Sequence, residues 1–283
     1  MDTLTHWLHS GLPLANWLNA AIAWGTEHLK WLTEPMSDGM SWSIDHLKNG
    51  LMWVPVPLMI AAIALLAFWR CGKGMGLFAI VGLALLWNLD LWEPLIYSFD
   101  LVLISTLLSI VIALPLGMLA ALYRPVEVVV RPILDLMQTM PAFVYLLPGV
   151  ALFSIGPMSA ILATVVFAMP PAVRFTILGI QQVPSSLDEG ADAFGSTRSQ
   201  KLFKLQLPLA RPTIMAGVNQ TVMLALSMSV IASMVGAEGL GKNVYGAIQM
   251  NDNGTAMVSG IGVVILAVLL DRIAQSFKGK EYT

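Results

Sequence analysis

Charged side chains are scarce in this sequence, and their scarcity excludes an ordinary soluble domain. Only 11% of the 283 residues are charged, whereas soluble domains carry roughly 25% because their surfaces must be hydrated. The mean hydropathy is +0.76, and hydrophobic residues make up 57% of the chain. This composition predicts a protein that places most of its surface in a lipid bilayer.

Cysteine and catalytic motifs are also nearly absent. The single cysteine, Cys71, excludes a disulfide within the chain. The sequence has no GxSxG, HExxH or strand-linked GxGxxG motif, and its histidines lack partners at metal-ligand spacing. The stretch GAEGLGKN (236–243) has phosphate-loop spacing, but Asn243 stands where a magnesium-binding hydroxyl belongs. We therefore expect no enzyme activity, no metal and no cofactor in this chain.

Long apolar runs are what the sequence does contain. Seven runs approach the roughly 20 residues that cross a bilayer: 54–69, 74–92, 98–123, 133–154, 157–180, 212–236 and 256–273. The fourth run contains Pro141 and Pro148, so the count of seven carries an uncertainty of one span.

The positive charges predict how these spans are oriented, because Lys and Arg are retained on the cytoplasmic side. With the 70–73 loop inside, twelve of the 15 Lys and Arg residues fall on the cytoplasmic side. The N-terminus is then expected outside, and the C-terminus, with a tail at 277–283, inside.

Residues 1–50 are predicted to form an extracytoplasmic amphipathic segment at the membrane surface. Leu and Trp recur at steps of three and four residues, and Trp17, Trp24 and Trp31 are spaced by seven. No basic region precedes an unbroken apolar core, so a signal peptide is not expected. Packing against a partner helix is the alternative explanation. Residues 51–95 are predicted to hold two transmembrane helices.

Ionisable groups are rare in the predicted spans, which argues against ion-coupled transport. Secondary transporters usually carry such groups near the bilayer midplane. Here they are expected near the ends of the spans: Asp90, Glu93 and Asp100 towards the outer surface, and Asp135, Arg174 and Asp271 towards the cytoplasm. A channel or carrier without ion coupling stays open at this point.

A charged loop interrupts the apolar chain between the fifth and sixth runs. Ser186 and Glu189 have the spacing of a capping box, which predicts a short helix that begins there. Gly195 is expected to end this helix in the left-handed conformation. Residues 196–197 should begin a second helix, which Pro208 should end. The loop is therefore predicted to form a helical knob on the cytoplasmic face.

This knob resembles the signature loop of the permease subunits of ABC importers. The family pattern is Glu-Ala-Ala, three residues, Gly, then about nine residues to a hydrophobic residue and Leu-Pro. The sequence matches it at Glu189, Ala191, Gly195, Leu207 and Pro208. It departs at position 190, where glycine replaces the usual alanine and should weaken the helix by roughly 1 kcal/mol.

Longer stretches resemble the glycine betaine and proline betaine permeases. They are LDLMQTMPAFVYLLPGVALFSIG (134–156), FAMPPAVRFTILGIQQVP (167–184) and QLPLARPTIMAGVNQTVMLALSMSVIASMVGAEGLG (206–241). The resemblance covers about residues 95–275. It implies an all-α polytopic membrane protein of about seven helices, with a five-helix type I ABC importer core at 96–276 and a coupling loop at 186–208.

The resemblance also implies a function and its partners. The chain would be the permease of an ATP-driven importer for glycine betaine or a related quaternary ammonium solute in the bacterial inner membrane. Its expected partners are an ATPase subunit that binds ATP and magnesium, a separate extracytoplasmic substrate-binding protein and a second permease copy, with no nucleic acid. The alternative is an uncoupled channel or facilitator for small osmolytes with a regulatory cytoplasmic loop.

Three groups of site residues are expected. ATPase coupling is assigned to Glu189, Gly190, Ala191, Asp192, Phe194, Gly195, Leu207 and Pro208. The translocation pathway is assigned to polar and adjacent residues of the fourth and sixth spans, which could instead only bond neighbouring helices: Gln138, Thr139, Phe143, Tyr145, Asn219, Gln220, Met223 and Ser227. Docking of the binding protein is assigned to Gly239, Leu240 and Gly241.

Overall fold

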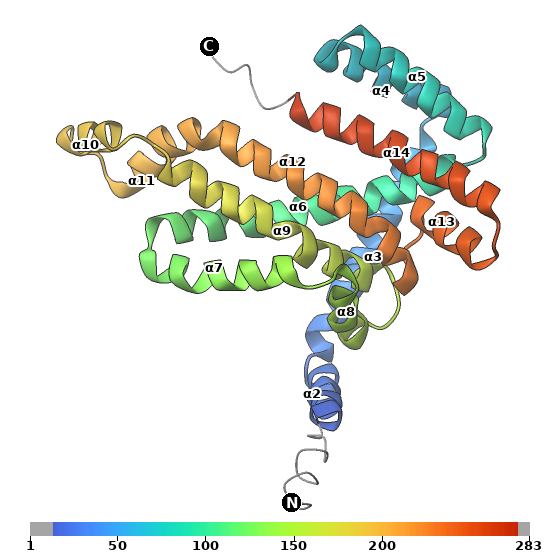
Figure 1. The fold of residues 1–283 in the computed structure, drawn as a ribbon, viewed down its shortest axis with the longest axis horizontal. Helices are drawn as coiled ribbons and strands as arrows, with labels where there is room; N and C mark the ends of the chain where they lie inside the picture. Colours follow the sequence, from blue (N-terminus) through green and yellow to red (C-terminus); the bar gives the residue numbers. More distant parts are fainter. Residues whose placement is uncertain (1–13, 277–283) are drawn as a thin grey trace, which may run out of the picture.

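The computed structural model describes residues 14–276, and every regular element in this range is a helix (Figure 1). The first half holds α2 (Leu14–His28), α3 (Lys30–Trp53), α4 (Val56–Cys71), α5 (Lys73–Asn88), α6 (Trp92–Leu122) and α7 (Arg124–Thr139). The second half holds η1 (Ala142–Tyr145), α8 (Leu146–Phe153), α9 (Pro157–Gln181), α10 (Ser185–Ala193), α11 (Arg198–Lys201), η2 (Leu202–Gln206), α12 (Leu207–Ala232), η3 (Ser233–Val235), α13 (Leu240–Gln249) and α14 (Asn253–Gln275). The expected all-α class is confirmed.

The centre of the fold is the bundle of α6, α9 and α12, which lie side by side (Figure 1). Glycines let these helices approach closely. A Cβ on Gly217 of α12 would lie 2.7 Å from the Cβ of Phe175 in α9, and one on Gly117 of α6 would lie 2.6 Å from that of Thr176. In a bilayer, where lipid is as apolar as the side chains, such close packing is a main source of helix association.

Four helical segments among the described residues are long and apolar enough to cross a membrane: Trp92–Leu122, Pro157–Gln181, Arg198–Val235 and Asn253–Gln275. Two further helix pairs reach this length but are bent by 96° and 114° at their junctions. Helix α5 is apolar but has only 16 residues. A polytopic protein is confirmed, while the expected count of seven spans stays a prediction.

The run at 133–154, counted as the fourth span, is not one continuous helix. Helix α7 ends at Thr139, and the chain turns by 114° before α8. The cause is Pro141, because a proline disfavours the α-helical conformation of the residue before it. Met140 accordingly has φ −71° and ψ 139°.

The N-terminal helices α2 and α3 run at a steep angle to the central bundle (Figure 1). They pack against α8, and α3 also contacts α6 and α9. Trp17, Trp24 and Trp31 are all exposed, and Lys48 of α3 forms a 3.1 Å ion pair with Glu93 of α6. The part of the amphipathic prediction that concerns residues 1–13 lies outside the described residues, and placement at the membrane surface stays a prediction.

Candidate coupling site and translocation pathway

The first helix of the loop, α10, begins at Ser185 without a side-chain cap. The predicted capping box of Ser186 and Glu189 is therefore wrong. Pro184 occupies the N-cap position with φ −57° and ψ 131°, and its fixed φ directs the chain into the helix two residues before the expected N-cap at Ser186. Ser186 consequently lies inside the first turn.

The turn after α10 has the conformation that the sequence predicts. Gly195 has φ +74°, its N–H donates to the Asp192 carbonyl at 2.9 Å, and the Ser196 N–H donates to the Ala191 carbonyl at 3.0 Å. This pair of bonds is a Schellman motif, which requires a left-handed residue at the position of Gly195. The prediction that Gly195 ends the first helix is confirmed.

The second helix of the loop, α11, begins with a complete capping box. The Thr197 hydroxyl accepts from the Gln200 N–H at 3.3 Å, and the Gln200 side-chain oxygen accepts from the Thr197 N–H at 2.9 Å. These reciprocal bonds satisfy two backbone donors that a helix start leaves free. The expected start of the second helix at 196–197 is confirmed.

The expectation that Pro208 ends this second helix is wrong. Helix α11 continues through η2, a wide π-type turn, into α12, so that residues 198–235 form one helical segment. In η2 the Leu207 N–H donates to the Leu202 carbonyl, five residues back. This wider spacing accommodates the ring of Pro208, which would clash with the preceding turn of a regular α-helix.

Polar side chains tie α10 to the following helix. Lys201 forms a 2.8 Å ion pair with Asp192, and the Gln206 side-chain amide donates to Asp188 at 3.0 and 3.1 Å. Within its described range α10 has no buried residue, and the Phe194 side chain after it is 93% exposed. Residues 185–206 therefore form a knob that is fixed in shape but leaves an apolar surface uncovered.

Six of the eight predicted coupling residues lie together on this knob: Glu189, Gly190, Ala191, Asp192, Phe194 and Gly195. A groove of about 680 Å³ runs between the two helices, lined in part by Leu187, Gly190, Ala191, Phe194 and Lys204. Leu207 and Pro208 lie apart from it, at the start of α12. The knob thus offers a partner both a groove and a protruding aromatic ring.

The predicted pathway residues fall into an exposed set and a packed set. The exposed set comes from α7, η1 and one face of α12: Gln138, Thr139, Phe143, Gln220, Met223 and Ser227. The packed set is Tyr145, which is buried with its hydroxyl donating to the Met137 carbonyl, and Asn219, whose side chain donates to Asp271 at 3.0 Å. Two of the elements that carry the exposed set, η1 and α12, are in contact. Its role in the pathway stays a prediction.

The predicted docking residues Gly239, Leu240 and Gly241 are buried. The Leu240 N–H donates to the Ser98 hydroxyl at 2.8 Å, and a Cβ on Gly241 would lie 2.7 Å from the Ser229 carbonyl oxygen. These three residues fix the turn against α6 and α12. Their part in docking stays a prediction, and it would act through the shape of the turn, whose exposed residues include Glu238 and Lys242.

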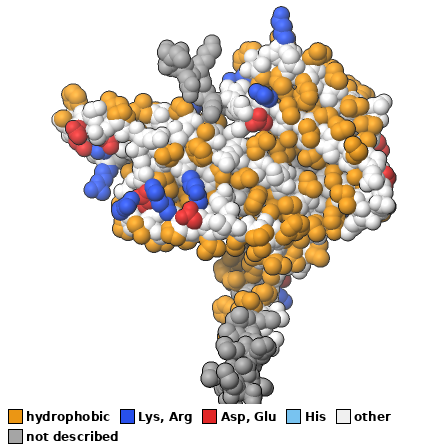
Figure 2. Space-filling view, in the orientation of Figure 1, with side chains coloured by type: hydrophobic (Ala, Val, Ile, Leu, Met, Phe, Trp, Pro, Cys, Tyr) orange, Lys and Arg blue, Asp and Glu red, His pale blue; other side chains and the backbone are white. Residues whose placement is uncertain are grey.

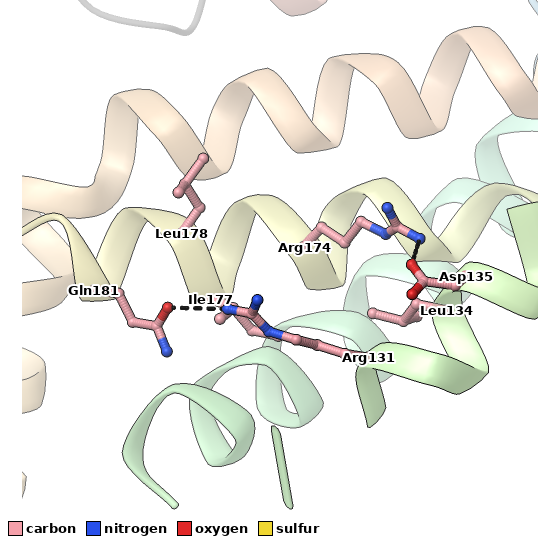
Figure 3. A pocket seen from close by; sticks show the side chains of 7 residues that line it. All are labelled: Arg131, Leu134, Asp135, Arg174, Ile177, Leu178 and Gln181. Atoms are coloured by element: carbon pink, nitrogen blue, oxygen red, sulfur yellow. Dashed lines mark hydrogen bonds and ion pairs between the residues drawn. The ribbon is translucent and has the colours of Figure 1, made fainter. Parts of the chain in front are cut away.

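A charged groove between α7 and α9 was not among the predicted sites. Arg174 and Asp135 form a 2.7 Å ion pair there, and Arg131 donates to Gln181 at 3.5 Å (Figure 3). Its volume is about 290 Å³. A sequence signal existed, since the polar residues of α7 recur at steps of three and four along one face: Arg124, Glu127, Arg131, Asp135 and Gln138.

Basic and acidic side chains of the visible face gather mainly at the knob and over α7 beside it (Figure 2). Glu127 of α7 is buried, pairs with Arg124 at 2.9 Å and with Arg131, and accepts from the Gln181 amide at 3.0 Å. On the rest of this face, hydrophobic side chains are interspersed with uncharged atoms, and charged side chains are few. The charged groove is therefore an exception on a face with few charges.

The bundle, the broken helix pair α7–α8 and the helical knob together define a membrane transport subunit. Residues 113–278 match the family described as the binding-protein-dependent transport system inner membrane component, and the chain belongs to this family.

Similar curated proteins cover nearly the whole chain. The glycine betaine transport system permease protein OpuAB of Bacillus subtilis is 46% identical over 95% of this chain and 96% of its own. The glycine betaine/carnitine transport permease protein GbuB of Listeria monocytogenes is 48% identical over the same shares. ProW of Escherichia coli, a glycine betaine/proline betaine permease protein, is 46% identical over 94% of this chain and 75% of its own. The resemblance to this permease group is confirmed.

The fold is also similar to a chain of the MetNI methionine ABC transporter in an inward-facing conformation. The TM-score is 0.62 at 24% sequence identity, and the match covers 66% of this chain and 94% of that chain. The likeness confirms the expected fold of a type I importer permease.

Proposed function

We propose that this chain is the permease subunit of an ATP-driven importer of glycine betaine or a related quaternary ammonium solute. The names of relatives 46% and 48% identical over 95% of the chain support this solute class. The coupling role rests on one observation about the knob: backbone hydrogen bonds fix the turn between its helices, while the Phe194 side chain stays 93% exposed.

The knob is suited to pass a force into the membrane. We expect it to lie in a groove of a separate ATPase subunit, which would bind ATP and magnesium. Because α11 continues without a break into α12, a displacement of the knob would move α12 as a rod. Helix α12 packs along α9, so the movement would reach the bundle and change access to the pathway.

The proposal includes two further partners, a binding protein and a second permease copy. A binding protein would deliver the solute at the end of the bundle that carries the 236–242 turn, and a second permease copy would complete the pore. The chain would lie in the inner membrane with its N-terminus outside and its knob in the cytoplasm, as the positive charges favour.

Removal of the Phe194 ring tests the coupling role. In Phe194→Ala the free permease should keep its thermal stability, because an exposed ring contributes little to folding. The variant should lose its ATPase on purification, and ATP-dependent uptake of glycine betaine into proteoliposomes should fall at least tenfold. Phe68→Ala, at an exposed phenylalanine of α4, should retain both.

Two outcomes would contradict the proposal. A Phe194→Ala variant that keeps its ATPase and its uptake would show that the knob is not the contact. Wild-type permease that equilibrates glycine betaine across liposomes without an ATPase would instead establish the uncoupled facilitator.

A further inference from the structure

If α9 spans a bilayer, the α7–α9 groove holds charges below the level of the headgroups. At a rise of 1.5 Å per residue, Arg174 lies roughly 10 Å from the knob end of α9 and Asp135 roughly 16 Å from the start of α7. Helix α9 has 25 residues and is about 38 Å long, compared with a hydrocarbon core of about 30 Å. The Arg174–Asp135 pair therefore lies below headgroup level if these helices span the membrane.

The direction of the Arg174 side chain supports this placement. Long basic side chains near a membrane surface usually extend towards the headgroups. Figure 3 shows the opposite, since Arg174 extends away from Gln181, at the knob end of α9, and towards Asp135. The Arg174 and Asp135 side chains are 45% and 69% exposed. Charges exposed at this depth face water rather than acyl chains, because exposure to hydrocarbon costs several kcal/mol or more.

The groove has the chemistry to bind a small zwitterion. Arg131 and Arg174 present guanidinium groups, which bind carboxylates through paired hydrogen bonds, and Asp135 presents the opposite charge a few ångströms away. Arg131 is also paired with Glu127, which has Arg124 and Gln181 as its other partners. Leu134, Ile177 and Leu178 supply an apolar wall for methyl groups. When a zwitterion binds, its carboxylate would pair with Arg174 and its quaternary ammonium group with Asp135. Each charge of the original ion pair would therefore keep a counter-ion.

Binding at this groove should be weak. The residues that line it in the described chain include no aromatic ring, so the strongest means of holding a quaternary ammonium group, cation–π contact, is missing. Both charged partners are also already paired with each other. Weak binding suits a site from which a solute must leave.

We propose that the groove of Arg131, Asp135, Arg174 and Gln181 is a water-filled transit site for the zwitterionic solute on the knob side of the membrane. The identity of the solute rests on the proposed function, whereas the access of water does not. In this site Arg174 and Arg131 bind the carboxylate, and Asp135 with the apolar wall receives the quaternary ammonium group.

Cysteine labelling tests the site without relying on transport, because Cys71 is the only native cysteine. In a Cys71→Ser background, Leu178→Cys places a thiol in the groove, and Leu136→Cys places one on the apolar face of α7. The complex with its ATPase is placed in nanodiscs without nucleotide and treated with a water-soluble maleimide. Leu178→Cys should react at least tenfold faster than Leu136→Cys, and 50 mM glycine betaine should slow it about threefold or more, on the order expected for a weak site.

Each alternative gives a distinct result. Equal slow labelling at both positions would overturn the water-filled groove. Rapid labelling that glycerol or choline chloride at equal osmolality slows as much as glycine betaine would overturn zwitterion binding. Protection that follows the replacement of neutral by anionic phospholipid, with no effect of glycine betaine, would assign the groove to a lipid headgroup and overturn the proposal.

Uptake in proteoliposomes completes the test. Asp135→Asn and Arg174→Gln should each lower ATP-dependent uptake at least tenfold while ATP hydrolysis stimulated by the loaded binding protein persists. The exchanged variant, Asp135→Arg with Arg174→Asp, keeps the ion pair but reverses its polarity and should not recover uptake. Recovery would show that the pair only holds α7 to α9. Wild-type complex that fails to take up glycine betaine would contradict the proposed function. The labelling rates would still decide whether the groove is filled with water, because that part does not depend on the solute.

Discussion

The central bundle and the knob are adjacent along the chain, yet different interactions hold them. In the bundle, Ala172 and Ala225 are completely buried, glycines sit within van der Waals contact of the next helix, and hydroxyls such as that of Thr176 bond to their own helix. In the knob, α10 buries no residue within its described range, and a Schellman turn, a capping box and surface polar pairs fix the shape.

This difference has a functional consequence. A helix contact built on small residues is specific because volume must match on both sides, so the bundle can move only as packed units. A knob whose shape depends on backbone bonds leaves its side chains free for a partner. The two regions should therefore respond differently to the same kind of substitution.

The largest contrast is expected between two glycine-to-alanine changes. Gly217→Ala places a Cβ 2.7 Å from that of Phe175 and 3.1 Å from the Pro171 carbonyl oxygen, and overpacking of this kind costs about 1–3 kcal/mol. Gly190→Ala meets no atom within 4 Å and should favour α10 by up to about 1 kcal/mol. In thermal unfolding of the purified permease, only Gly217→Ala should lower the transition temperature. Equal shifts would show that the bundle and the knob do not differ in packing.

Gly195→Val should affect the knob and leave the bundle unchanged. The φ of +74° at this position costs a residue with a side chain roughly 1–2 kcal/mol and a β-branched one more. The variant should therefore lose the Schellman turn and its ATPase while its unfolding transition stays within about 1 °C of wild type. Gly195→Asn is the matched control, because asparagine tolerates the left-handed region. Loss of the ATPase from the Asn variant as well would point to a direct contact of the glycine rather than its conformation.

A smaller effect is expected at the start of α11. Thr197→Ala removes the hydroxyl that accepts from Gln200, a loss worth about 1 kcal/mol. If that free energy opens α11 locally, amide hydrogen exchange at 198–201 should quicken about fivefold, with no change in α9. Thr197→Ser keeps the hydroxyl and should exchange like wild type. A change spread through α9 would mean that the knob and the bundle unfold as one unit.

The sequence predicted those parts of this contrast that depend on local chemistry. Apolar runs predicted the helices of the bundle, and Gly195 predicted the turn of the knob. Both features depend on residues that are neighbours in the sequence. Pro141 also marked the break locally, but the sequence did not predict the 114° angle between the two helices. The prediction of a Ser186 cap for α10 was wrong because Pro184 takes the N-cap position, which places Ser186 inside the helix.

Features that depend on two distant segments were not predicted. The wide turn that accommodates Pro208 between α11 and α12 is accompanied by distant contacts, since Leu202 packs in a cluster with Ile180 and the Gln206 side chain donates to Asp188. The charged groove requires α7 and α9 to lie side by side, which brings Asp135 to Arg174. In the sequence, Asp135 and Arg174 each resembled a charge near the end of a helix. The ion pair between them is visible only in the structure.

The smallest effect is expected from the ion pair that joins the two helices of the knob. The hydrogen bond from Lys201 to Asp192, together with the carboxylate charge, raises the pKa of Lys201 above its ordinary value of 10.5. A group with a raised pKa contributes stability that is complete below its unfolded pKa and is lost as the pH rises through its folded pKa. The knob should thus keep its protease resistance from pH 6 to 9 and lose part of it only above about pH 10.5.

Subtilisin cleavage at the knob, measured by mass spectrometry, tests this loss. Asp192→Asn, treated at the same pH values, is the control, because it removes the ion pair while any effect of pH on the protease stays the same. An exposed pair contributes little, so the bundle should show no matching change. If cleavage of wild type and of Asp192→Asn rises in parallel above pH 10.5, the pair does not hold the knob, and the Schellman turn and capping box alone fix its shape.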